Sequence, residues 1–406
     1  QGDPLGPLLF SLVILPLIKQ LNEKFELKFN VWYLDDANII CNRTDIPEIL
    51  SFLETEGQKV GLSLNRQKTK AYCKNNDYIN DDINVVNGEG FVTLGCPIGT
   101  KEFVEDFAIQ TKLKDIEIDI RKIEELQDPQ SQMLLLRSCL SYPKVVYLLR
   151  TCPTDRLLNF CSKFDSMMSN SLSVIIGSYL TKKQLDQCFL AFHSGGLGFK
   201  STTQYAPAQY VGSFIKSTDV VDDHLLKLNL TSQNSIPDNI LNELNQNPGI
   251  PNDDFLDSLK QINNPQLVLN TQIATEAQRL FEASLVTSTE KSTYKSIKNG
   301  EAADIFKRIP YRFGKHVLPP IYFQSKAKLH LGIDQYPYEQ KCAKCELNIN
   351  DNLGTHATIC IYGGGTITRH NKIRDLIILH CNRGGLGAKA EKNYLIPGSS
   401  KKPADC

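Results

Sequence analysis

The first sixty residues alternate between helical and strand-like patterns of apolar and polar positions. A long apolar stretch over residues 8–28 predicts a helix that is bent or interrupted at Pro16, because an interior proline removes a backbone hydrogen bond. Two short apolar runs, Val31–Leu34 and Ala37–Cys41, meet at a pair of acidic residues, which is the pattern of a β-hairpin. Apolar residues at helical spacing then predict a second helix over residues 46–60.

Strand-like patterns continue over residues 62–99, where Asn87–Gly88 is a dipeptide typical of hairpin turns. From about residue 104 to residue 192 the pattern changes to long amphipathic helices, which favours a helix bundle. The clearest apolar stripe of this part consists of Ile109, Leu113, Ile116, Ile120, Ile123 and Leu126. Residues 200–310 continue as shorter helices between joints rich in Asn and Pro. The chain is therefore predicted to be an α+β protein.

Composition agrees with a globular protein of two or three domains, since the chain has 406 residues, of which 41% are hydrophobic and 22% are charged. Its 45 Lys and Arg residues balance its 45 Asp and Glu residues. A nucleic-acid-binding protein of this length is more often basic, so any contact with nucleic acid is expected to be local.

Neither a membrane protein nor a secreted protein is indicated. The longest apolar run, Leu8–Ile18, is about half the length that spans a bilayer, and no basic segment typical of a signal peptide precedes it. Twelve cysteines are too sparse for a disulfide scaffold in a chain of this length. We expect reduced thiols and a location in the nucleus or the cytoplasm.

The acidic pair at the predicted hairpin is the first candidate for chemistry. Tyr33-Leu34-Asp35-Asp36 places two neighbouring carboxylates at a tight turn, where they cannot both point into a core. Nucleotidyl transfer uses such carboxylates to hold Mg²⁺ ions beside the attacking and leaving oxygens. An Asp-Asp turn by itself is more often a solvated hairpin, so its interpretation depends on the neighbouring segments.

Three further segments surround this turn in a characteristic order. Gln1–Phe10 precedes it, Gly61–Thr69 follows about thirty residues later, and Leu94–Gly99 comes last. In this order and spacing the four segments resemble the palm motifs B, C, D and E of reverse transcriptases, most strongly those of non-LTR retrotransposons. Taken one at a time, the flanking segments could be a Pro/Gly-rich loop, a loop with a surface lysine, and an ordinary strand and turn.

The resemblance implies a role for particular residues. Asp35 matches the metal-binding aspartate of the family's YxDD turn, and Asp36 matches its partner, so both would bind Mg²⁺ in catalysis. Lys68 matches the motif D lysine, a cation suited to stabilising or protonating the leaving pyrophosphate. The remaining matches are the template- and nucleotide-facing residues Gln1 and Gly2, the turn residue Tyr33, and the primer-grip residues Leu94 and Gly95.

The function implied by the resemblance is RNA-directed DNA synthesis, primed at a chromosomal nick and catalysed by two metal ions. The partners would be an RNA template, a DNA primer or target, and deoxynucleotides. In the family, motif A, with an aspartate that bridges both metals, lies upstream of motif B, and this chain begins at Gln1 inside motif B. We interpret the chain as a fragment truncated at both ends and expect that it does not polymerise alone. The alternatives are a non-catalytic nucleic-acid-binding remnant and a decayed retroelement product.

A second candidate site has the spacing Cys342-x2-Cys345-x10-His356-x3-Cys360. Two thiolates on a short knuckle, followed by an imidazole and a thiolate one helical turn apart, can close tetrahedrally on Zn²⁺. Four protein ligands suggest a structural zinc rather than a catalytic one. Unligated thiols beside a surface histidine are the alternative interpretation, and His370 is a rival fourth ligand.

This cluster also resembles the CCHC segment that precedes a restriction-like endonuclease in some non-LTR elements. Lys402–Asp405 then resembles the start of that nuclease, with Asp405 as its first catalytic aspartate, although the segment could equally be a tail. The predicted segments are a partial palm with motifs B to E (1–103), a helical thumb (104–200), a helical linker region (201–335), a zinc module (336–381) and the start of a truncated endonuclease (382–406).

Overall fold

The computed structural model describes residues 2–72, 84–86, 88–227, 238–245, 258–298, 301–309, 317–336, 340–349 and 353–390. The N-terminal region contains α1 (Gly6–Lys24), β1 (Phe29–Tyr33), β2 (Asp36–Ile40), α2 (Ile46–Lys59), β3 (Lys70–Tyr72), β4 (Asn84–Val86), β5 (Gly90–Thr93) and β6 (Cys96–Gly99). A short 3₁₀ turn, η1 (Arg43–Asp45), leads into α2.

A long run of helices follows. It contains α3 (Lys101–Phe107), α4 (Lys114–Glu124), α5 (Pro129–Leu135), α6 (Tyr142–Thr151), α7 (Leu158–Ile176), α8 (Lys182–Cys188), α9 (Thr202–Lys227), α10 (Asp238–Asn245), α12 (Pro265–Ala283), α13 (Ser288–Ile297), α14 (Asp304–Lys307) and α15 (Pro320–His330). Two π-helical segments, η2 (Ala108–Leu113) and η3 (Leu136–Leu140), and three 3₁₀ turns, η4 (Thr154–Arg156), η5 (Phe192–Ser194) and η6 (Glu301–Ala303), lie between them.

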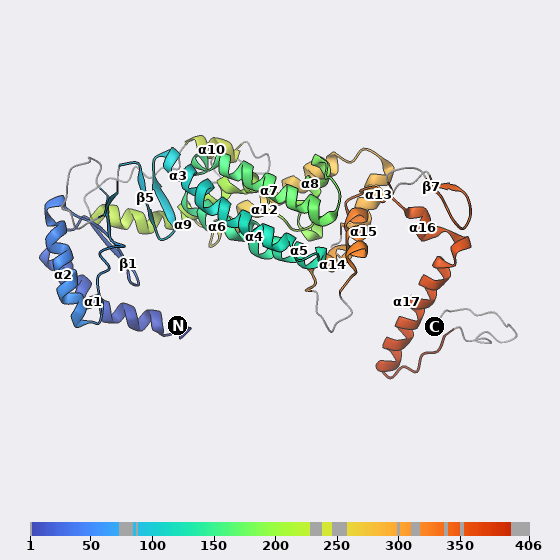
Figure 1. Ribbon diagram of the computed structural model, residues 1–406, viewed down its shortest axis with the longest axis horizontal. Coiled ribbons are helices and arrows are strands. Elements are labelled where there is room, and N and C mark those ends of the chain that lie inside the picture. Colours follow the sequence, from blue (N-terminus) through green and yellow to red (C-terminus); the bar gives the residue numbers. More distant parts are fainter. Residues whose placement is uncertain are drawn as a thin grey trace.

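The C-terminal region consists of β7 (Gln340–Lys341), β8 (Asn348–Ile349), α16 (Thr355–Ile359), η7 (Ile361–Gly363) and α17 (Gly365–Arg383). Figure 1 shows the three regions arranged along one elongated molecule, with α1 and α2 at one end and α17 at the other. Helices dominate and the sheets are small, which confirms the predicted α+β class.

Helices α1 and α2 cover one face of the β1–β2 hairpin and leave its opposite face uncovered. Its strands pair in antiparallel register from Phe29 opposite Ile40 to Tyr33 opposite Asp36. Because side chains alternate along a strand, Trp32 and Ile39 point to the same side, where they pack on the core formed by α1 and α2. That small core is formed by Leu17, Leu21, Phe25, Ile49 and Leu53.

Several local predictions for this region are confirmed and two are wrong. The predicted hairpin and the helix over residues 46–60 are present as β1–β2 and α2. Helix α1 is not interrupted at Pro16, which is exposed, so the carbonyl freed at exposed Leu12 can bond to water, while the bend that was the alternative stays a prediction. The helix ends at Lys24, short of the predicted residue 28.

The second wrong prediction concerns the strands around Asn87–Gly88. The flanking strands do not pair with each other there, because β4 pairs in parallel with β3 and β5 pairs with β6. Asn87 itself lies outside the described residues. The palm sheet expected from the sequence is thus present in the described residues as separate two-stranded sheets.

One hydrophobic core runs through the helical region from Val104 to Ile333. Its largest fully buried side chains include Phe160, Phe164, Phe199, Phe306 and Phe323. The core takes residues from both sides of position 200, where the sequence predicts a boundary between thumb and linker. This core therefore joins the predicted thumb and linker in the described residues, beside a smaller separate cluster of Leu190, Phe281, Leu285, Tyr294 and Ile297, and the domain boundaries stay a prediction.

A glycine-rich loop at Ser194–Phe199 holds several helices of the helical region together. A Cβ atom added at Gly196 would lie 2.0 Å from the carbonyl oxygen of Leu190, so the backbone approaches more closely than any other residue allows. The Tyr294 hydroxyl donates to the Ser194 carbonyl at 2.9 Å. Burial lowers the pKa of His330 to about 4, and its neutral ring donates Nε2–H to the Gly195 carbonyl at 3.0 Å.

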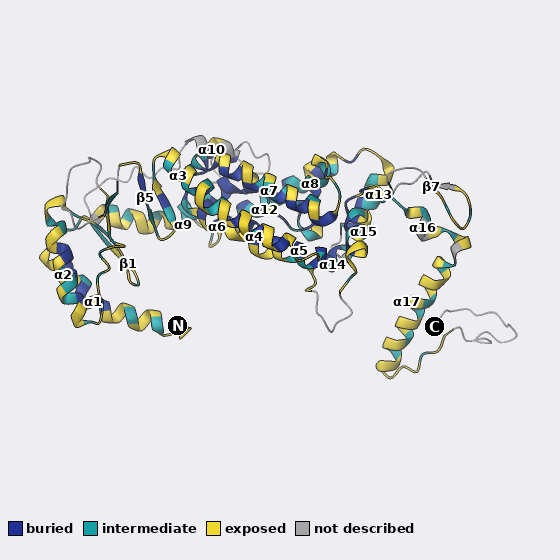
Figure 2. Cartoon of the chain, viewed as in Figure 1, coloured by how far each residue is buried: buried dark blue, intermediate teal, exposed yellow. Residues whose placement is uncertain are grey.

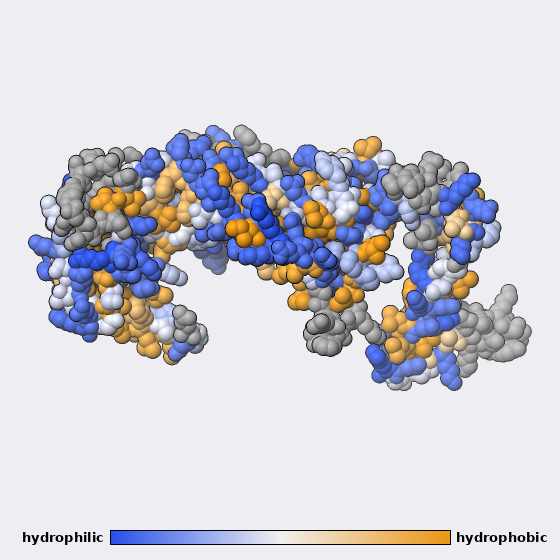
Figure 3. All heavy atoms as spheres, in the orientation of Figure 1, coloured by the Kyte–Doolittle hydropathy of each residue, from blue (hydrophilic) through white to orange (hydrophobic). Residues whose placement is uncertain are grey.

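Both ends of the molecule expose apolar side chains. In α17 none of the described residues is buried (Figure 2). Hydrophobic residues gather around the N-terminus in Figure 3, where the exposed set in and before α1 is Leu5, Leu8, Leu9, Leu12, Val13 and Leu15. Among the described residues, no helix combines the length and the apolar character that crossing a membrane requires.

We expect Gly196→Ala to destabilise the helical body by more than about 3 kcal/mol, because its Cβ would overlap backbone that other helices fix in place. Gly365→Ala, at an exposed helix start where a Cβ meets nothing within 4 Å, is the matched control and is expected to be neutral or slightly stabilising. Urea denaturation followed by circular dichroism measures both variants. Equal midpoints would contradict the role of the loop.

Candidate functional site

The acidic pair lies at the tip of the β1–β2 hairpin. Leu34 and Asp35 form its two-residue loop, and Leu34 has a φ of 55°, a left-handed conformation that costs roughly 1–2 kcal/mol for a residue other than glycine. Asp35 and Asp36 are exposed, and neither carboxylate makes a hydrogen bond or an ion pair with the described residues. Both carboxylates are therefore available to a ligand from solvent.

Asp36 belongs to the face of the hairpin that α1 and α2 do not cover. It is paired with Tyr33, and Asn38 follows two residues later, so all three side chains lie on the side opposite Trp32 and Ile39. Helices α1 and α2 cover the other side. This face is thus the side of the hairpin on which a substrate can approach Asp36.

The second hairpin, β5–β6, lies against this face. Its two-residue loop is Leu94–Gly95, with φ values of 49° and 76°. The Thr93 hydroxyl, directly before the loop, donates to Asn38 Oδ1 at 2.6 Å. One hydrogen bond therefore joins the segment predicted as primer grip to the strand that begins with Asp36.

Helix α6 holds the same hairpin from the other side. The Tyr147 hydroxyl donates to the carbonyl of Leu94 at 2.9 Å. Cys96 Sγ lies 3.8 Å from Cys152 Sγ just after α6, and Arg156 Nη1 donates to the carbonyl of Gly99 at 2.6 Å. The β5–β6 hairpin is anchored at its turn, its middle and its base.

The electrostatics of this junction reflect its partial burial. Partial burial raises the pKa of Tyr147, and the neighbouring Cys96, Cys152 and Tyr33 add to the increase. A hydrogen bond from Cys152 lowers the pKa of the Cys96 thiol, while the same bond and burial raise the pKa of Cys152. Tyr33 of the acidic turn is therefore near enough to Tyr147 of α6 to contribute to the raised pKa of Tyr147.

The sequence patterns did not identify these anchoring residues. Tyr147 contacts a residue 53 positions earlier, and Thr93 contacts one 55 positions earlier, so no local pattern could pair them. The available signal is the helical spacing of Tyr147 and Thr151, which places both on one face of α6. That face carries the contacts with β5–β6, since the Thr151 carbonyl lies 3.9 Å from the Cys96 sulfur.

The other predicted polymerase residues lie on separate elements. Gly2 is exposed just before α1, with a φ of 91°, and Gln1 lies outside the described residues. Exposed Lys68 lies on the loop after α2, where its backbone N–H donates to Asn65 Oδ1 at 3.1 Å. Among the described residues, no hydrogen bond or ion pair joins Gly2 or Lys68 to the Tyr33–Asp36 turn.

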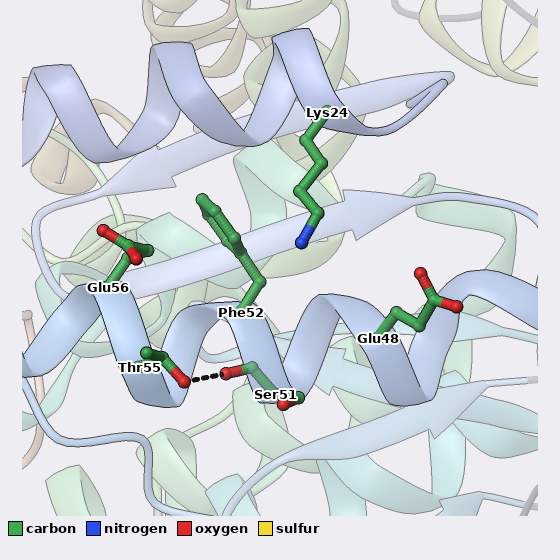
Figure 4. Close-up of a pocket in the computed structure, with 6 residues that line it drawn as sticks. All are labelled: Lys24, Glu48, Ser51, Phe52, Thr55 and Glu56. Carbon is green, nitrogen blue, oxygen red and sulfur yellow. Dashed lines mark hydrogen bonds between the residues drawn. The ribbon is translucent and has the colours of Figure 1, made fainter.

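A shallow pocket between α1 and α2 is a separate feature. It is lined by Lys24, Glu48, Ser51, Phe52, Thr55 and Glu56 (Figure 4). The Lys24 ammonium lies 5.1 Å from the ring centroid of Phe52, a cation–π contact. Because these helices cover the face of β1–β2 opposite Asp36, the pocket does not serve the acidic turn.

The four residues of the predicted zinc site come together in the C-terminal region. Cys342 Sγ lies 3.8 Å from Cys360 Sγ, and Cys345 Sγ lies 3.3 Å from His356 Nε2. All four ligand atoms lie within 4.8 Å of one another. A tetrahedral zinc with Zn–S bonds of about 2.3 Å separates two sulfurs by about 3.8 Å, so the donor set and its spacing fit Zn²⁺.

Local backbone geometry explains the cluster. The N–H of Glu346 donates to the Cys342 carbonyl at 2.8 Å, and the N–H of Cys342 donates to the Leu347 carbonyl at 2.9 Å, which closes a tight knuckle. Backbone N–H groups of Cys345 and Lys344 hold the pKa of the Cys342 thiol down at about 6. The thiolate that a metal needs is therefore favoured at neutral pH.

Two other sequence predictions fall outside this cluster. His370, the rival ligand, is exposed on α17 and does not belong to the group of four. Asp405 and the rest of residues 391–406 lie outside the described residues, so the nuclease residue stays a prediction.

Comparison with known proteins agrees with the motifs. Residues 1–100 match the family described as reverse transcriptase (RNA-dependent DNA polymerase). The retrotransposable element SLACS 132 kDa protein of Trypanosoma brucei gambiense is 23% identical over 207 residues, which are 51% of this chain and 17% of that protein. The chain thus aligns with less than a fifth of its relative. Residues 1–100 are thus similar to reverse transcriptases, and half of the chain is similar to part of a retrotransposable element protein.

Proposed function

We propose that this chain supplies part of the catalytic palm and the thumb of an RNA-directed DNA polymerase, whose substrates are an RNA template, a DNA primer and deoxynucleotides. The observation that carries the proposal is the hydrogen bond between Thr93 and Asn38. It brings the predicted primer-grip turn beside the strand of the acidic pair, on the face that α1 and α2 leave open. A primer end held by that turn would lie close to Asp35 and Asp36.

The residues of this site would have different roles in nucleotidyl transfer. Asp35 and Asp36 would hold Mg²⁺, which, when bound, neutralises charge on the phosphate oxygens during in-line displacement. Gly2, with no side chain, allows backbone to approach the nucleotide or the template. Lys68 has its ammonium group in solvent and would bring positive charge to the leaving pyrophosphate.

The acidic pair by itself supplies few ligands for two metal ions. Among the described residues, the cysteine–histidine cluster is the group of three or more His, Cys, Asp or Glu side chains that lie close enough to share an ion. No third carboxylate of the described residues joins Asp35 and Asp36. Two Mg²⁺ ions require several oxygen ligands each. We therefore propose that polymerisation needs the family's motif A aspartate in addition to the residues of this chain.

We expect the 406-residue chain to show no template-dependent, Mg²⁺-dependent primer extension, and Asp35→Asn to behave identically. Denaturing electrophoresis of a labelled DNA primer on an RNA template is the measurement. Extension by the unaltered chain that Asp35→Asn abolishes would contradict the need for a further carboxylate while supporting the role of Asp35. Extension by both proteins would contradict both assignments.

We also propose that Cys342, Cys345, His356 and Cys360 hold one structural Zn²⁺. The geometry supports this, because four N and S donors occupy one shell and leave no protein-free position for a substrate. The surrounding elements are a two-residue strand pair and the short helix α16, which bury little apolar surface. A bound metal would therefore supply much of the folding free energy of this region.

We expect the purified chain to carry about one zinc per molecule, and Cys360→Ser to lose it, because three ligands cannot close the shell. Cys381→Ser is the matched control, since Cys381 lies on α17 outside the cluster. Zinc affinity should also fall as the pH drops, because protons compete with the metal for the ligand thiolates. Metal analysis after gel filtration measures these outcomes, and equal zinc loss in both variants would contradict the assignment.

A further inference from the structure

The sequence motifs do not include the residue of α6 that contacts the β5–β6 turn. Tyr147 lies on α6, outside every segment that resembles a palm motif, yet its hydroxyl donates to the Leu94 carbonyl at 2.9 Å. In a two-residue hairpin loop the carbonyl of the first loop residue has no partner across the ladder. Tyr147 therefore supplies the hydrogen bond that the turn itself cannot make.

The turn needs this support because its backbone conformation is unfavourable. Leu94 has a φ of 49°, and a non-glycine residue in this region is held there by its surroundings. The hydroxyl of Tyr147 fixes the peptide that follows Leu94, and the bond from Thr93 to Asn38 fixes the residue before it. Both sides of the strained residue are thus tied, one to α6 and one to β2.

The position of Tyr147 also favours contact with the functional face. Tyr147 is 49% exposed, Leu94 is 44% exposed and Tyr33 is 65% exposed, so all three border solvent, and Tyr33 of the acidic turn is near enough to Tyr147 to affect its pKa. Aromatic side chains on such a surface suit the bases and sugars at the end of a nucleic acid strand. Tyr147 therefore contacts the turn and remains exposed to solvent.

We propose that Tyr147 is a positioning residue for the primer: by holding the Leu94 carbonyl it fixes the β5–β6 turn at the distance from Asp35 and Asp36 that a recessed 3′ end requires. This inference rests on the proposed polymerase function. It assigns to the helical region a part in placing the primer end, exerted through the Leu94 carbonyl. Removing the hydroxyl would leave the turn free to move, and primer binding would then have to restore its order.

The test compares two duplexes of equal length, an RNA–DNA hybrid with a recessed DNA 3′ end and the same hybrid with blunt ends. Fluorescence anisotropy measures the affinity of the full chain for each. We expect Tyr147→Phe, which removes only the hydroxyl, to weaken binding of the recessed hybrid about 2- to 10-fold, the range that one hydrogen bond contributes. Binding of the blunt hybrid, which depends on backbone charge, should not change.

Two further variants separate positioning from loss of structure. Tyr179→Phe removes a tyrosine hydroxyl from an 85% exposed site between α7 and α8 and should change neither affinity. Thr93→Val breaks the bond to Asn38, and if both bonds act through the same turn, the double variant should lose less affinity than the two single losses multiplied together. Thermal melts of all variants should coincide with that of the unaltered chain.

The outcomes distinguish failure of the positioning role of Tyr147 from failure of the proposed polymerase function. Equal affinity of Tyr147→Phe and the unaltered chain for the recessed hybrid, or an equal loss on both hybrids, would overturn the positioning role while leaving the proposed function in place. Multiplicative losses in the double variant would overturn action through one turn. If the unaltered chain does not prefer the recessed hybrid, the proposed function fails, and the inference fails with it.

Discussion

The β5–β6 hairpin is the part of the structure on which the relation between the two larger bodies depends. The N-terminal core around Leu17 and Leu21 and the helical core around Phe160 and Phe164 are separate clusters of buried residues. The hairpin lies between them and bonds to both, through Thr93 to β2 and through Gly99 to Arg156. Because this hairpin is held on both sides, it helps to fix the place of the acidic turn relative to the helices.

Helix α9 supplies a second connection between the bodies. Its N-terminal turn is fixed in the helical body, where the Asp165 carboxylate accepts hydrogen bonds from Ser201, Thr202 and Thr203. Its other end reaches the first hairpin, where the ring of His224 lies 6.4 Å from that of Phe29 (Figure 1). Two contacts at different points restrict rotation more than one does, so α9 and the β5–β6 hairpin together set the orientation of the acidic turn.

The sequence predicts what short-range patterns determine. The β1–β2 hairpin, helix α2 and the spacing of Cys342 to Cys360 are each encoded within some twenty residues, and the structure contains all of them. The contacts of Tyr147 and Thr93 span more than fifty residues, and their partners are a backbone carbonyl and an amide side chain that carry no distinctive pattern. The continuation of α1 through Pro16 could not be predicted from the sequence either, because it depends on the exposure of the neighbouring turn.

The two candidate metal sites also differ in whether local or long-range contacts assemble them. The cysteine–histidine cluster takes all four donors from a stretch of nineteen residues, so local turns are enough to assemble it and a spacing rule is enough to find it. The acidic turn presents two carboxylates in solvent, and the proposed catalysis would depend on other segments for everything else that it needs. A structural site can be closed by its own loop, whereas a polymerase site must stay open to a duplex and a nucleotide. Its precision must therefore come from long-range contacts such as those of the β5–β6 turn, and these are the contacts that a sequence pattern does not reveal.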